Sequence, residues 1–158
     1  EIIQRDMVSV RVSQPFRFVV VGAPEYLARR GMPKRPEDLL RHECLTFHLP
    51  TSGALYAWEL ERGRRTWRIP VRGSVVVTNE GMLCSKLAAL GLGLAYAQES
   101  LVEDELQRGR LQVVLEPFAP KVPGYFLYFP RRAQGLNPLR LFVDTARELL
   151  ARGRKGPS

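Results

Sequence analysis

Segments typical of β-strands and of α-helices alternate along almost the whole chain, and this alternation limits the fold more than any other feature of the sequence. Short Val-rich or aromatic runs predict strands at 7–13, 16–22, 44–47, 56–61, 66–71, 74–78, 92–97, 111–115 and 125–129. Pro, Ser or Asn followed by helical apolar spacing predicts helices at 23–31, 80–90 and 100–107, and from residues 36 and 137. We therefore expect an α/β fold whose strands pair mostly in parallel.

Length and hydropathy restrict the class of protein further. The 158 residues suit one domain or two small lobes. No apolar run approaches the roughly 20 residues needed to cross a bilayer, so we expect no membrane partner. The first residues, EIIQRD, lack the apolar run of a signal peptide, and the missing initiator Met suggests a fragment.

The formal charge of +8, from 24 basic and 16 acidic residues, raises the question of nucleic acid. The basic residues form only small clusters, namely Arg62, Arg64 and Arg65, then Arg131 and Arg132, then Arg152, Arg154 and Lys155. Because no dense basic stripe exists, we interpret the excess as a solvated surface, with weak attraction of anions as the alternative.

No catalytic or metal site is expected. His42, Cys44 and His48 are close in sequence, but a zinc site needs about four ligands. The sequence has no GxSxG elbow, and the Gly91-Leu92-Gly93 run follows a predicted helix instead of opening one, so it is not a dinucleotide loop. Cys44 and Cys84 stand alone, which favours a reduced, cytoplasmic compartment. We expect no catalytic residue, no metal and no cofactor.

One junction could bind a ligand. Thr78, Asn79, Glu80, Gly81 and Met82 lie where a buried strand passes into a helix. The free N–H groups of a helix start can hold a carboxylate or phosphate, and ligands collect at the carboxyl ends of strands in open α/β sheets. The alternative is that Thr78 or Asn79 only caps the helix.

The order and spacing of several segments resemble the effector-binding half of LysR-type transcriptional regulators. The resemblance runs from Asp6 to Leu150, and its most specific parts lie at 24–44 and 88–115. They read APEYLARRGMPKRPEDLLRHECL (from residue 23) and LAALGLGLAYAQESLVEDELQRGRLQVVLEPF (from residue 87), and GYFLYFPRR and LRLFVDTARELL follow.

This resemblance implies a two-lobed α/β fold of the periplasmic-binding-protein type 2, with mixed, mostly parallel sheets. One lobe would comprise 23–118, and 1–22 with 119–150 would form part of the other, before a disordered tail at 151–158. The effector would lie in the cleft between the lobes. The residues implied to bind it are Gly22, Ala23, Thr78, Asn79, Glu80, Gly81, Met82, Ala97 and Gln98.

The resemblance also implies the partners: a small-molecule effector, either a carboxylate or an aromatic compound, and further copies of the chain in a dimer or tetramer. Promoter DNA would be bound only through a helix-turn-helix head, which this sequence lacks together with the start of the first lobe. We therefore expect uncovered apolar surface, and partner chains or disorder, around 1–20 and 121–158.

Two other classes of protein remain as alternatives. An extracytoplasmic solute-binding protein of the same fold would carry a signal or lipid-anchor sequence upstream. An enzyme on this scaffold would need a nucleophile and a base together in the cleft.

Overall fold

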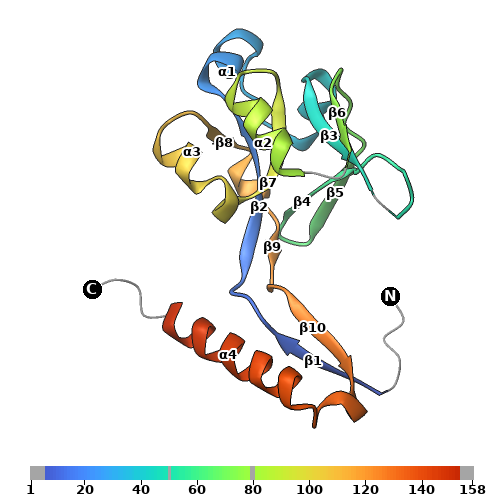
Figure 1. Cartoon of the computed structure of the whole chain (residues 1–158). Coiled ribbons are helices and arrows are strands. Elements are labelled where there is room, and N and C mark those ends of the chain that lie inside the picture. The colour runs from blue at the N-terminus through green and yellow to red at the C-terminus, as the bar shows by residue number, and fades with distance from the viewer. Residues whose placement is uncertain (1–5, 50, 79–80, 154–158) are drawn as a thin grey trace. The chain divides into compact units, whose positions relative to one another are not determined.

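The computed structural model describes residues 6–49, 51–78 and 81–153 (Figure 1). Its strands are β1 (Met7–Arg11), β2 (Phe16–Gly22), β3 (Cys44–His48), β4 (Trp58–Arg62), β5 (Arg65–Ile69), β6 (Val76–Thr78), β7 (Leu94–Gln98), β8 (Gln112–Val114), β9 (Lys121–Val122) and β10 (Phe126–Pro130). Its α-helices are α1 (Pro24–Arg30), α2 (Gly81–Ala89), α3 (Glu103–Gln107) and α4 (Asn137–Gly153). Four 3-10 turns are described, η1 (Pro36–Arg41), η2 (Glu99–Leu101), η3 (Glu116–Phe118) and η4 (Arg131–Ala133).

The chain forms two compact units, which we call unit 1 (residues 1–16 and 122–158) and unit 2 (residues 17–121). This division differs by a few residues from the lobe of 23–118 that the family resemblance implied, and the bounds of the lobes stay a prediction. Helix α4 continues through Gly153, although the disordered tail was predicted from 151. Residues 154–158 lie outside the described part of the chain.

Unit 2 is built on one mixed sheet with the strand order β6-β3-β7-β2-β8, in which β9 also pairs with β2. Strand β3 is parallel to β6 and to β7, whereas β2 is antiparallel to β7 and to β8. The mixed α/β class is therefore confirmed, but the expectation of mostly parallel pairing is wrong. The physical reason is that β2 joins the sheet beside β7 in the reverse direction, and strand direction is not encoded in local residue pattern.

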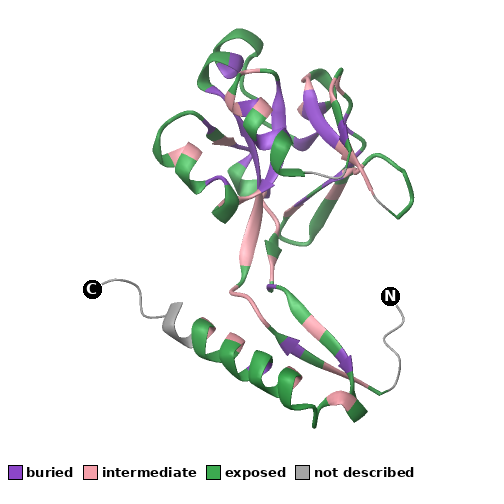
Figure 2. Cartoon of the chain, viewed as in Figure 1, coloured by how far each residue is buried: buried purple, intermediate pink, exposed green. Residues whose placement is uncertain are grey.

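Both faces of this sheet are covered, which explains the continuous apolar runs in its central strands. On one face, Cys84 and Ala88 of α2 pack with Val19, Val21 and Leu45. On the other face the core comprises side chains from α1, η1 and the antiparallel ribbon β4–β5, among them Tyr26, Leu27, Leu39, Trp58, Leu60 and Ile69. Figure 2 shows the buried residues concentrated in β2, β3 and β7.

Unit 1 has a much smaller core. Its strands β1 and β10 form a two-stranded antiparallel ribbon. Val10, Phe129 and Val143 are its buried core residues, and α4 contributes Val143 and the partly buried Leu139. Much of the surface of α4 is exposed in Figure 2. Phe142 and Leu149 of α4 are more than half exposed.

Candidate functional site

The carboxyl ends of three strands meet at one edge of the unit 2 sheet, which we call the carboxyl edge. The register pairs His48 at the end of β3 with Thr78 at the end of β6. Because β7 is parallel to β3, its last residue, Gln98, lies at the same edge. Helix α2 begins there at Gly81. The strand-to-helix junction predicted from the sequence is therefore at a strand end where ligands collect in folds of this kind.

The structure brings most of the predicted effector residues to this edge. Thr78, Gly81 and Met82 are exposed, and Gln98 is half-buried and donates a hydrogen bond from Nε2 to the Ser100 Oγ at 2.8 Å. Ala97 is buried in the core beneath α2, so its side chain cannot reach a ligand. The two further predicted residues of the junction, Asn79 and Glu80, lie outside the described residues.

The structure separates Gly22 and Ala23 from the other predicted effector residues. Gly22 pairs with Leu94, the first residue of β7, whereas Gln98 pairs with Phe18. At about 3.3 Å per residue, the two ends of β7 are roughly 13 Å apart. Gly22 is also packed so closely that an added Cβ would lie 2.6 Å from Leu94 Cδ2. Gly22 and Ala23 therefore lie at the opposite edge of the sheet, because β2 runs antiparallel to β7, and their role in effector binding stays a prediction.

Sequence reasoning missed an aromatic cluster near the carboxyl edge. The rings of Phe18 and Tyr96 stack with centroids 5.0 Å apart, and those of Phe47 and Tyr56 with centroids 5.1 Å apart. Tyr56 also contacts Tyr96 at 6.1 Å, which joins the two pairs. Phe47 is next to the edge residue His48, and Phe18 is opposite Gln98. The four rings come from β2, β3, the segment before β4, and β7, so no local sequence pattern predicts the cluster.

An ion pair lies beside the same edge. Arg17 donates from Nε to Glu99 Oε2 at 2.6 Å and from Nη2 to Glu99 Oε1, and its Nη2 is 3.3 Å from Glu116 Oε1. The hydrogen bond from Arg17 lowers the pKa of Glu99 below the ordinary value of 4.5. Donation of this hydrogen bond to Glu99 raises the pKa of Arg17 in turn. Both groups are therefore charged at neutral pH.

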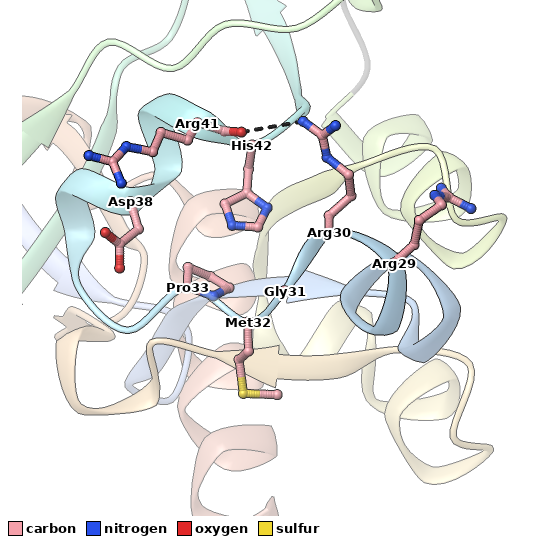
Figure 3. Close-up of a pocket in the computed structure, with 8 residues that line it drawn as sticks. All are labelled: Arg29, Arg30, Gly31, Met32, Pro33, Asp38, Arg41 and His42. Atoms are coloured by element: carbon pink, nitrogen blue, oxygen red, sulfur yellow. Dashed lines mark hydrogen bonds between the residues drawn. The ribbon is translucent and has the colours of Figure 1, made fainter.

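A hollow of about 350 Å³ lies between α1 and η1, away from the carboxyl edge (Figure 3). It is lined by Arg29, Arg30, Gly31, Met32, Pro33, Asp38, Arg41 and His42. Arg30 Nη2 donates to the backbone carbonyl of Arg41 at 3.4 Å, and Arg29 Nη2 donates to the carbonyl of Gly91 at 3.2 Å. The guanidinium groups point in different directions in Figure 3, so they do not converge on a common anion.

The titratable groups of unit 2 give no support for catalysis. Burial lowers the pKa of His42 below 6.5, with Arg30 adding to the effect, so the ring is neutral at pH 7. Burial raises the pKa of the Cys44 thiol to about 12 and also raises that of Cys84, which makes both thiols poor nucleophiles. Within the described residues, no three His, Cys, Asp or Glu side chains are grouped as metal ligands would be.

The described helices also include none with the length and apolar character of a membrane span.

Comparison with known families identifies what this arrangement resembles. The family model described as the LysR substrate binding domain matches residues 4–151. A "Putative transcriptional regulator" of Pseudomonas aeruginosa is 37% identical over 152 residues, which cover 96% of this chain and 49% of the relative. The "HTH-type transcriptional regulator PgrR" of Escherichia coli is 34% identical over 140 residues, covering 89% of this chain and 46% of the relative. The chain thus spans about half the length of these curated relatives.

Solved structures agree on the fold. The regulatory domain of AphB from Vibrio vulnificus superposes with a TM-score of 0.75 at 20% identity, covering 94% of this chain and 71% of the other. The CrgA regulatory domain of Neisseria meningitidis, a LysR-type regulator, gives a TM-score of 0.70 at 23% identity, covering 93% and 71%. The fold is the type 2 periplasmic-binding-protein fold of these domains.

Proposed function

Because the chain belongs to the LysR substrate-binding domain family, we propose that it is the sensing part of a longer cytoplasmic regulator, whose helix-turn-helix head binds promoter DNA. Domains of this family bind small-molecule effectors and are not enzymes. The chain matches about half of each of these curated relatives, and one of them is named an HTH-type transcriptional regulator. This supports a longer protein in which one part senses the effector and another binds DNA.

The effector of this protein, in our proposal, binds at the carboxyl edge. The observation that carries the proposal is the convergence of Thr78, Gln98 and the first turn of α2 at the ends of three strands. Gly81 leaves the approach open, because a Cβ added there would meet only Phe47 Cε1, at 3.8 Å. The cleft between the lobes stays a prediction drawn from the family resemblance.

We propose a carboxylate with an aromatic or other planar apolar group as the effector. The free N–H groups at the start of α2 favour an anion. The half-buried rings of Phe18 and Phe47 offer an apolar surface to the planar or aromatic group of the effector. Arg17, whose charge Glu99 neutralises in this structure, is a cation that a ligand carboxylate could engage.

Binding would act on transcription through a shift between two arrangements of the complete, oligomeric regulator. An effector changes such an equilibrium only by its different affinity for the two states. A coupling of about 1–3 kcal/mol corresponds to roughly a 5- to 150-fold change in DNA affinity.

The test is a thermal-shift screen of small carboxylates and aromatic compounds on the chain, followed by titration of each hit against Gly81→Ala. The new methyl group should obstruct the edge and weaken binding by about tenfold, or roughly 1.4 kcal/mol. It should not lower stability, because alanine favours a helix over glycine by up to about 1 kcal/mol. Gly135→Ala is the matched control, since a Cβ there meets nothing within 4 Å.

Loss of binding without loss of stability in Gly81→Ala alone would support the site. Hits that bind both glycine variants and Gln98→Ala as tightly as the parent chain would contradict it.

A further inference from the structure

A groove on another part of unit 2 has the chemistry of a second binding site. It has a volume of about 580 Å³ and is lined by Arg35, Pro36, Glu37, Arg62, Arg65, Trp67 and Phe118. These residues come from η1, the β4–β5 ribbon and η3. None of them is at the carboxyl edge, and the volume is within the range of small-molecule pockets.

The ribbon brings two arginines to the groove through its register. Trp58, Leu60 and Arg62 follow one another on one face of β4, and their partners on β5 are Ile69, Trp67 and Arg65. Trp58, Leu60 and Ile69 are buried in the core. The same face therefore changes from apolar at the base of the ribbon to doubly cationic at its tip, where Arg62 and Arg65 are directly opposite each other.

Two aromatic rings lie beneath these cations. The Arg65 guanidinium carbon is 4.6 Å from the centroid of the Trp67 ring, and that of Arg62 is 5.4 Å from the centroid of Phe118. The two rings meet edge to face with centroids 5.3 Å apart. Stacking on aromatic rings holds each planar guanidinium in place while leaving its N–H groups able to meet an anion.

The carboxylate in the groove does not balance its positive charge. Glu37 Oε1 accepts a hydrogen bond from Trp67 Nε1 at 2.9 Å and is 3.8 Å from Arg65 Nη2. Three arginines and one glutamate line the groove, and Arg35 is also paired with Asp38, its Nη2 lying 3.9 Å from Asp38 Oδ1, so a formal excess of one positive charge remains. Among the described residues, Arg62 has no ion-pair partner.

We propose that this groove binds a small organic anion, with its phosphate or carboxylate between Arg62 and Arg65 and its ring against Trp67 and Phe118. Recognition depends on the charge, the planar ring and the apolar area of the ligand together. Neither an inorganic anion without a ring nor a neutral ring should therefore bind as tightly. The site is independent of the effector site proposed above.

The test follows tryptophan fluorescence of the whole chain during titration with phenyl phosphate, inorganic phosphate and benzyl alcohol. Trp67 lines the groove, and the other tryptophan, Trp58, is 1% exposed, so a ligand should change the emission of Trp67. We expect saturable binding of phenyl phosphate at least tenfold tighter than that of either other compound. The same titration with benzoate distinguishes a preference for phosphate from one for carboxylate.

The decisive variant is Arg62→Gln with Arg65→Gln, which should weaken phenyl phosphate binding by at least tenfold. The matched control is Arg64→Gln with Arg68→Gln, which removes two charges from the same ribbon at residues that do not line the groove. All four side chains are exposed, so both variants should fold, and circular dichroism checks this. A third variant, Arg62→Lys with Arg65→Lys, keeps the charge but loses the planar fork and should also bind more weakly.

Equal loss in the two glutamine variants would reduce the effect to net charge and overturn the proposal. Equal binding of inorganic and phenyl phosphate, or no saturation with either phenyl phosphate or benzoate, would also overturn it. Gly81→Ala should leave phenyl phosphate binding unchanged, so failure of the groove and failure of the effector site are separate results.

Discussion

At the scale of single residues, oppositely charged side chains form ion pairs near the ends of strands. Arg17 is the first residue of unit 2 on β2, and its pairing with Glu99 and Glu116 joins β2 to the turns that follow β7 and β8. Glu99 and Arg17 have about a third of their side chains exposed, so solvent screens the pair. Such an ion pair contributes less than about 1 kcal/mol, and its main effect is to position its neighbours.

Glu99→Gln should therefore show a small, pH-dependent loss of stability. The pKa of Glu99 is lower in the folded than in the unfolded chain, so its stabilisation is complete above the unfolded value near 4.5 and is lost as the pH falls through the folded value. We expect the variant to be less stable than the parent at pH 7, by under about 1 kcal/mol, and this difference in unfolding free energy to narrow as the pH falls below 4.5. Urea unfolding from pH 3 to 8 measures this, with Glu103→Gln as the control. A gap that persists unchanged at pH 3 would contradict the assignment.

At the scale of elements, local signals predicted what local residues decide. Gly91, which was predicted to end α2, has the left-handed φ of +75° expected there. Gly93 belongs to the tight turn and not to a phosphate loop, since an added Cβ would lie 2.6 Å from the carbonyl oxygen of Glu43. The predicted helix start at Ser100 is wrong, because the turn η2 comes first and α3 begins at Glu103.

The pairing of elements that are distant in sequence could not be predicted from local residue patterns. The direction of β2 in the sheet depends on pairing with β7 and β8, and this direction separates Gly22 and Ala23 from the carboxyl edge. The aromatic cluster of Phe18, Phe47, Tyr56 and Tyr96 likewise depends on which strands become neighbours. The junction at Thr78 was found because a strand end and a helix start are adjacent in sequence.

The stability of the β4–β5 ribbon depends on the buried side chains at its base, Trp58, Leu60 and Ile69. A two-stranded ribbon is at best marginally stable alone, so packing of its inner face must hold it. Trp58→Ala should destabilise the chain by about 3–5 kcal/mol, because it removes a fully buried aromatic side chain. Thr66→Ala, at an exposed position of the same ribbon, should cost less than about 1 kcal/mol. Urea denaturation compares the two, and a Trp58→Ala loss as small as that of Thr66→Ala would show that the ribbon is not anchored in this way.

At the scale of the whole molecule, the two units differ in how much apolar surface they bury. Among the residues that the structure describes, unit 2 has two core clusters, one on each face of its sheet, whereas the core of unit 1 has three buried residues. Large exposed apolar side chains in unit 1 are Tyr125, Phe126, Tyr128, Leu136, Leu141, Phe142 and Leu149. Exposed apolar surface of this extent is typical of an interaction site. Covering of unit 1 by partner chains, for which disorder was the alternative, stays a prediction.

Hydrogen exchange should separate the two units. Amides of β1 and β10 should exchange faster than those of β2 and β7 in dilute protein, because few buried contacts oppose their opening. Their protection should rise with protein concentration if a second copy covers unit 1. Mass spectrometry at two concentrations measures both effects, and light scattering reports the oligomeric state. Equal protection of β1 and β7 in a monomeric sample would contradict the prediction.

The change along the inner face of the β4–β5 ribbon, from Trp58 and Leu60 at the base to Arg62 at the tip, has a consequence for evolution. Folding constrains one end of the ribbon and leaves the other end free to vary. Substitutions at the tip could therefore exchange one bound compound for another without first requiring a compensating change in the core. Related chains could diverge in the compounds they recognise while keeping the same scaffold, and protein engineers could use the same freedom.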